Sequence, residues 1–97
     1  MSDVRRLVLD LLKPSEVETE EFPSAIADLD GVAGVNATLL ERDREVENLK
    51  LTIEGPGIDS DRVRAAIETL GGTLHSVDEV VCGERLVEES YTKQDRV

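Results

Sequence analysis

The side chains most capable of chemistry stand together at positions 75–79, in a segment whose apolar spacing suggests a strand. This run holds the single histidine of the chain and two adjacent carboxylates. Oxygen ligands suit calcium or magnesium better than zinc, so the run predicts a divalent-cation site completed by a neighbouring strand or subunit. The candidate ligands are Asp78, Glu79, Asp10, His75 and Glu54. The alternative is a histidine held by a hydrogen bond beside solvated acids, since 22 aspartates and glutamates in 97 residues bring carboxylates together by chance.

Nucleophilic catalysis has less support in the sequence. Cys82 is the single cysteine, so it forms neither an internal disulfide nor a zinc cluster, and free cysteines mostly pack as small apolar groups. The obvious cation near enough to activate it is Arg85. The glycine-rich turn at 55–57 lacks both the Walker lysine and the dinucleotide-binding spacing. The sequence therefore predicts no catalytic residue and a protein that is not an enzyme.

Apolar spacing predicts the elements that carry these residues. Alternating leucines over residues 3–13 predict a strand that ends at Pro14. A helix follows, with Thr19 as its expected N-cap and Gly31 beyond its end. Its buried stripe is Phe22, Ala25, Ile26 and Leu29.

The second half of the chain repeats the first at an offset of about 41 residues. Strands are expected over 34–42, 47–54 and 73–82, and a helix capped by Asp59 or Ser60 precedes the last of them. Two βαβ halves joined by a hairpin predict a ferredoxin-like βαββαβ fold, a four-stranded antiparallel sheet with both helices on one face. The alternation of side chains does not decide which residues of the 73–82 strand face the core, and a bulge within that strand would bring its apolar residues onto one side.

A sheet covered by helices on one side leaves its other face open, and such a face usually meets another chain or a ligand. Residues 84–91 are too apolar at their centre for a frayed end, and we expect them to extend the last strand or to add a fifth one, also at a neighbour's sheet edge. Residues 1–91 then form one domain, followed by a disordered tail at 92–97. The expected contacts between subunits are Val8, Leu12, Leu40, Leu86 and Val87.

The charge balance excludes two classes of partner. A net charge of −11 and a pI of about 4.4 argue against nucleic acid and against an anionic membrane surface. We find neither an apolar run of about 18 residues nor a secretory signal, so we expect a cytoplasmic protein. Many acids and three lysines are typical of a halophile, with the acids serving solvent adaptation rather than one cation-binding surface.

Three motifs resemble the archaeal domain-of-unknown-function family 211. They are Leu9-Asp10-Leu11-Leu12-Lys13-Pro14, Gly31-Val32-Ala33-Gly34-Val35-Asn36 and Leu74-His75-Ser76-Val77-Asp78-Glu79-Val80-Val81-Cys82-Gly83. The resemblance extends to about Glu89 and implies a ferredoxin-like fold that assembles into rings, with no established activity and no functional residues. Cys82 departs from the family pattern, in which small residues such as alanine occupy this position, and this departure further weakens a role for the thiol.

Taken together, the sequence predicts a non-enzymatic homo-oligomer that binds a cation or small effector at subunit boundaries. The alternative is a regulatory module similar in layout to amino-acid-binding ACT domains, in which effectors sit between paired subunits. In that case the turn at 31–35 would approach the ligand, although helix termination explains the same glycines.

Overall fold

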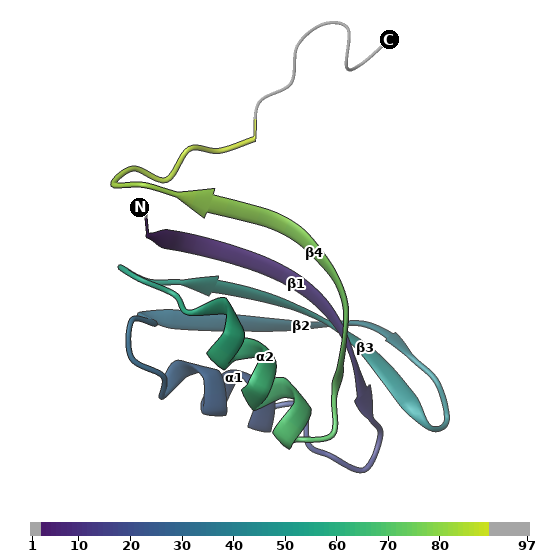
Figure 1. Ribbon diagram of the computed structural model, residues 1–97. Coiled ribbons are helices and arrows are strands. Elements are labelled where there is room, and N and C mark those ends of the chain that lie inside the picture. Colours follow the sequence, from purple (N-terminus) through teal and green to yellow (C-terminus); the bar gives the residue numbers. More distant parts are fainter. Residues whose placement is uncertain (1–2, 90–97) are drawn as a thin grey trace, which may run out of the picture.

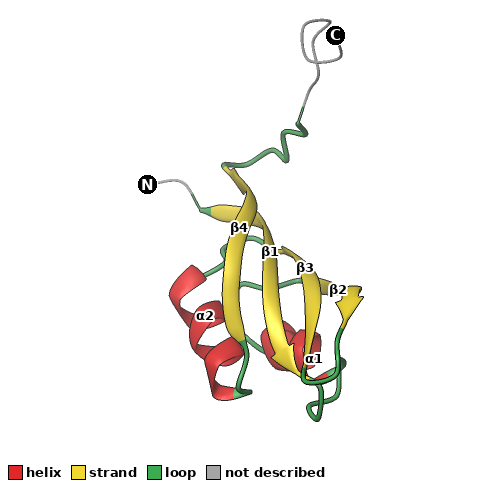
Figure 2. Ribbon diagram, turned by 90° about the vertical axis from the view of Figure 1, so that its right-hand side faces the viewer, coloured by secondary structure: helices red, strands yellow, loops and turns green. Residues whose placement is uncertain are grey.

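Four antiparallel strands form a single sheet: β1 (Val4–Pro14), β2 (Gly34–Arg42), β3 (Val46–Glu54) and β4 (Thr73–Cys82). The structure is a computed structural model that describes residues 3–89. The strand order is β2-β3-β1-β4, so β1 and β3 are central and β2 and β4 form the two edges (Figure 2). The leucines that alternate along β1 and β3 face one another across the sheet, which explains why these two strands hold the centre.

Both helices, α1 (Glu21–Ala27) and α2 (Ser60–Thr69), lie on one face of the sheet (Figure 1). Phe22 and Ile26 from α1 and Val63 and Ile67 from α2 close the core against β1 and β3. The βαββαβ order and the strand order confirm the predicted ferredoxin-like fold. Within residues 3–89, neither helix has the length or apolar character to cross a membrane.

The two helices begin differently. The carboxylate of Asp59 caps α2 by accepting hydrogen bonds from the backbone N–H groups of the second and third helical residues, as one of the two predicted caps should. The predicted cap of α1 was wrong: Glu20 is the N-cap residue and makes no side-chain cap bond. The carbonyl of Thr19 instead accepts a bond from the backbone N–H of Phe22, in a turn that precedes the helix.

The β1–β4 pairing has three register shifts, and the two that place an extra residue in β4 settle the question of facing. Val80, Val77 and Leu74 pair with the three core-facing leucines of β1, so all three share the helix side of the sheet. The extra residues fall where the register shifts, at Asp78 and His75. The bulge expected in this strand is thus confirmed, and it occurs twice.

One ion pair lies within the covered side of the sheet. Lys13 is 1% exposed, and its Nζ donates to the carbonyls of Pro14 (2.9 Å) and Val17 and to Oε1 of Glu47 (2.9 Å). Three acceptors match the three protons of the ammonium group, so burial leaves none of them unpaired. Glu47 also contacts the exposed Arg42 at 3.1 Å. The hydrogen bond from Lys13 lowers the pKa of Glu47 below its ordinary value.

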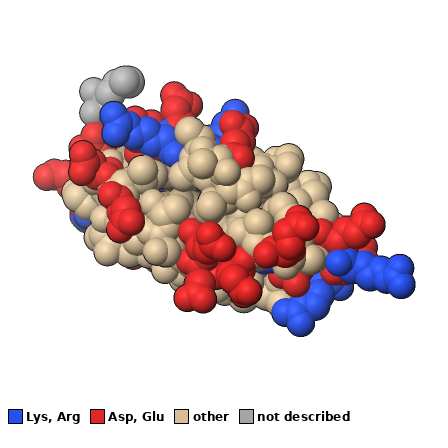
Figure 3. All heavy atoms as spheres, turned by 90° about the horizontal axis from the view of Figure 1, so that it is seen from below, with Lys and Arg blue, Asp and Glu red and all other residues tan. Residues whose placement is uncertain are grey.

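The chain after β4 forms no strand within residues 83–89, so the extra strand expected from the sequence is not found in the described part of the chain. Gly83 turns the backbone with a φ of +101°, a conformation that favours glycine. The remainder of the 84–91 segment and the tail expected at 92–97 lie outside the described residues. Carboxylates are spread across the helix side rather than gathered in one place (Figure 3).

Candidate functional site

The uncovered face of the sheet is the surface on which the sequence placed most contacts, and the strand register shows which residues share it. Arg6, Val8, Asp10 and Leu12 of β1 stand opposite the polar row of β3 and face away from the helices. Val8 is only 8% exposed, so the chain itself already covers this predicted contact residue. Leu12 is half-buried. Leu40 is exposed and lies at a register shift between β2 and β3.

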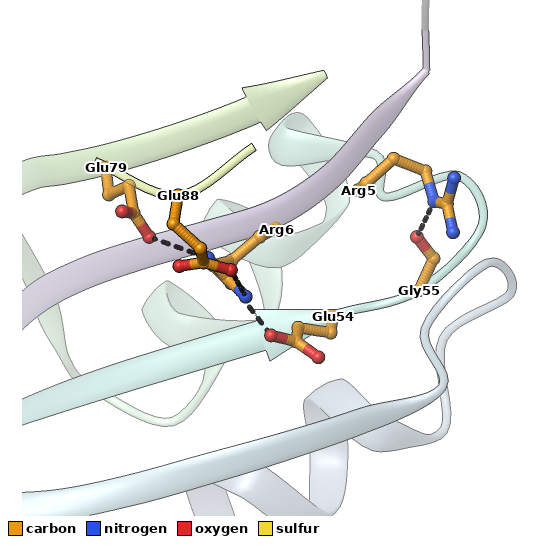
Figure 4. Close-up of polar contacts among 6 residues, drawn as sticks. All are labelled: Arg5, Arg6, Glu54, Gly55, Glu79 and Glu88. Atoms are coloured by element: carbon orange, nitrogen blue, oxygen red, sulfur yellow. Dashed lines mark hydrogen bonds and ion pairs between the residues drawn. The ribbon is translucent and has the colours of Figure 1, made fainter. Parts of the chain in front are cut away.

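Arg6 is the centre of a charged cluster at one end of this face (Figure 4). Its Nε donates to Oε2 of Glu54 at 2.7 Å, across the β1–β3 pair. Its two terminal nitrogens donate to the two carboxylate oxygens of Glu88, each at 2.8 Å, and one of them lies 3.6 Å from Glu79 of β4. One guanidinium thus gathers carboxylates from β3, from β4 and from the segment after β4. A bidentate pair of this kind fixes orientation as well as charge.

The pairing perturbs the titration of this cluster. The hydrogen bonds from Arg6 lower the pKa of Glu88, and the same bonds, with those to Glu54, raise the pKa of Arg6. Glu88 is about two-thirds exposed, so solvent screens much of this interaction. The Arg6 side chain itself is only 13% exposed, but Glu54 and Glu88 are open to solvent, so the cluster is an electrostatic latch at the surface rather than a dry reaction centre.

The latch has a second anchor. Arg5 donates from its Nη1 to the carbonyls of Gly83 (3.1 Å) and Glu84 (2.7 Å). Its Nε also donates to the carbonyl of Gly55 at 3.1 Å (Figure 4). We call residues 84–89 the C-terminal segment. Arg5 holds its start, through the carbonyls of Gly83 and Glu84, and Arg6 holds it at Glu88 on the open side of the sheet.

The predicted cation ligands do not converge. Across residues 3–89, no three His, Cys, Asp or Glu side chains stand where they could hold one metal ion. Asp10 accepts a hydrogen bond from Asn48, and Asp78 accepts one from Ser76 at 2.8 Å, so each carboxylate already has its own partner. His75 lies at a register break, and Glu79 stands near Arg6. A cation site completed by another subunit stays a prediction.

The lone thiol and the lone imidazole are far apart. Cys82 is exposed at the end of β4, and His75 is seven positions earlier on the same strand, roughly 20 Å away at about 3.3 Å per residue. They cannot form a nucleophile–base pair within one chain.

Hollows occur beside both sheet edges. A shallow one of about 440 Å³ borders the charged cluster and is lined by residues 33–36 of the loop and β2 together with Thr52 and Glu54 of β3. Another of about 380 Å³ lies beside β4 and includes Arg64, Glu68 and His75. A smaller one of about 110 Å³, which we call the α2–β4 groove, lies on the helix side. Its lining residues are Leu7, Leu9, Ser60, Arg64, Leu74, Val77 and Val80.

Sequence reasoning missed both the latch and the groove. For the latch, the available signal was the pairing of β1 with β3, which sets Arg6 opposite Glu54. For the groove, it was the spacing of three between Leu74, Val77 and Val80, because two bulges in β4 place all three on the same side of the sheet. Glu88 belongs to a segment for which strand pairing was expected, so its bond to β1 had no signal in the sequence.

The fold and this surface define a ferredoxin-like α+β domain with one helix-covered sheet face and one face bearing a charged latch. Residues 5–96 match the family DUF211, described as uncharacterised ArCR, COG1888, and the chain belongs to that family. It is also 48% identical over 96 residues to the uncharacterised protein MJ0319 of Methanocaldococcus jannaschii, with 99% of each chain covered.

Proposed function

We propose that this protein is a non-enzymatic, cytoplasmic subunit of a homo-oligomer, whose sheet edges and C-terminal segment contact other copies of the chain. The observation that carries the proposal is where the exposed large apolar side chains lie. Within residues 3–89 they occur in two groups: Leu39 and Leu40 of the edge strand β2 with Val46 at the β3 end of the same hairpin, and Val77 and Val80 of the edge strand β4 with Leu86 and Val87 of the C-terminal segment.

Each group lies beside a strand with an unpaired outer side. Edge strands with exposed apolar residues are the surfaces through which sheets most readily associate. Scattered single aliphatics need no explanation, but two groups at the two edges of one small sheet favour self-association. The separation of Cys82 from His75 and the solvent exposure of Glu88 beside Arg6 support a role in assembly over one in catalysis.

The test is the particle mass in solution, measured by light scattering at low and at high salt. We expect a multiple of the 10.7 kDa chain, formed more completely at high salt. Copies with a net charge of −11 repel one another, and the Debye length falls from about 30 Å at 0.01 M to about 3 Å at 1 M salt. A 10.7 kDa particle at both salt concentrations would overturn the proposal.

A second candidate function is the sensing of a small metabolite between subunits, as in ACT-like modules. It is favoured by the hollow of about 440 Å³ beside residues 33–36, which follows the turn at 31–35 and falls within the roughly 300–1,000 Å³ of ordinary ligand sites. A thermal-shift screen separates the candidates. Stabilisation by one metabolite supports sensing, whereas stabilisation by Ca²⁺ or Mg²⁺ alone supports an assembly with cations at its boundaries.

A further inference from the structure

The α2–β4 groove exists because α2 leaves part of β4 uncovered. Val77 and Val80 face the helix side, opposite Leu9 and Leu7, yet they remain 49% and 52% exposed. The floor of the groove is fully apolar, since Leu7 and Leu9 belong to the core. About half of each valine stays in contact with water, so the uncovered groove represents unused apolar surface.

The size of the groove selects the kind of occupant. At about 110 Å³ it is well below the roughly 300–1,000 Å³ of sites for small molecules. Its lining has no ring of polar groups that would orient a metabolite: Ser60 and Arg64 are its polar members, and both come from α2. One or two aliphatic side chains of another polypeptide fit this volume and this lining.

The C-terminal segment presents such side chains on the other side of the sheet. Leu86 and Val87 are 39% and 63% exposed. They stand between the anchors that Arg5 makes at Glu84 and Arg6 makes at Glu88, so the backbone around them is held in place before any partner arrives. Preorganisation of this kind lowers the entropy cost of docking.

A chain whose latch is closed cannot fill its own groove with this segment. Glu88 is bonded to Arg6 on the open face, whereas the groove lies on the helix side. Charge favours docking between copies: besides Glu88, which Arg6 holds, residues 84–89 contain Glu84 and Glu89 against one arginine, and within residues 3–89 Arg64 is the charged residue that lines the groove. Between copies that repel overall, an acidic segment meeting a cation is a favourable point of contact.

We infer that the α2–β4 groove of one copy receives Leu86 and Val87 from the C-terminal segment of a second copy, with Arg64 facing the acids that flank them. This inference rests on the proposed function and names the segment that makes the contact. Each copy then uses its open face for one neighbour and its helix side for another. Such a head-to-tail contact closes into a ring or continues as a filament.

Cross-linking between single-cysteine variants tests the contact directly. In a Cys82→Ser background, one population carries Val77→Cys and the other carries Leu86→Cys, and the two are mixed and oxidised. Both positions are exposed, so folding is expected to survive, and circular dichroism checks it. We expect a disulfide-linked heterodimer, because a bridge needs Cα atoms within about 7 Å.

The matched control pairs Val77→Cys with Ala27→Cys, an exposed position on α1 outside both apolar groups. At least five-fold more heterodimer from the Leu86 mixture than from the Ala27 mixture supports the inference. Equal yields, or no cross-link from an oligomeric wild type, overturn it while leaving the proposed function in place. A wild type that is monomeric by light scattering overturns the proposed function itself.

Discussion

Two basic residues of β1 meet a glutamate of β3 in the same antiparallel register, yet their surroundings are opposite. Lys13 pairs with Glu47 on the helix side, where both are buried, and Arg6 pairs with Glu54 on the open face. The lysine satisfies all its protons within the chain, whereas the arginine also reaches Glu88 in a segment that follows the sheet.

The difference shows how one local pattern serves two purposes. A buried pair is costly to break, because the surviving partner is left charged in a medium of low dielectric constant. An exposed pair contributes little to stability, since water and salt screen it. The Lys13–Glu47 pair therefore belongs to the fold, whereas Arg6, whose carboxylate partners are open to solvent, also holds a neighbouring segment.

The largest expected effect comes from Lys13→Met. The substitution keeps the aliphatic volume but leaves Glu47 buried with Arg42 as its remaining partner. We expect a loss of about 3 kcal/mol in the free energy of unfolding, the lower end for a broken buried pair. Urea denaturation measures it, and Lys50→Met is the control because Lys50 is exposed on the open face. Equal losses in both variants would remove the contrast between the two pairs.

Arg6→Met should lower the stability less than Lys13→Met, because the carboxylates of Glu54 and Glu88 remain open to water, but it should release the C-terminal segment. Arg85 lies between the two anchors, so trypsin should cleave after it several-fold faster in the variant than in the wild type. Cleavage after Arg44, in the loop between β2 and β3, provides an internal control that should not change. Unchanged cleavage at Arg85 would show that the bonds to Glu88 do not hold the segment.

The smallest effect is a difference at acid pH. The pKa of Glu88 is lowered by Arg6, so its stabilising contribution is present above the ordinary glutamate pKa and is lost as the pH falls through the lowered value. Glu88→Gln should therefore melt slightly below the wild type at pH 7, and the two melting temperatures should converge as the pH falls below the ordinary glutamate range. Glu89→Gln is the matched control. A constant offset at every pH would exclude the ion pair as the cause.

Apolar spacing was sufficient to predict the strands, because the leucines of β1 and β3 are buried on one side only and alternate accordingly. It could not predict the burial of Lys13, because the sequence does not distinguish a solvent-exposed lysine from a buried lysine whose ammonium group donates to backbone carbonyls. It also could not place Thr19 relative to α1, where Glu20 takes the N-cap position without a side-chain bond.

The candidate site was predictable only in part. The exposure of Leu40, Leu86 and Val87 follows from their position outside the alternating core pattern. The burial of Val8 depends on neighbours distant in the sequence, which no local pattern reports. Asp78 and Asp10 were expected to share a cation with further ligands, but within residues 3–89 no three such groups converge, and each of the two carboxylates has its own hydrogen bond.

The two extra residues in β4 also limit how far association can proceed. A strand whose amides and carbonyls are interrupted twice in ten positions offers an incoming straight strand no continuous ladder to copy. Uncontrolled edge-to-edge addition of strands, which leads to insoluble fibres, is therefore disfavoured at the edge where apolar residues are most exposed. Association at the β4 edge then depends on complementary side-chain contacts rather than on backbone pairing, and this favours assemblies of finite size.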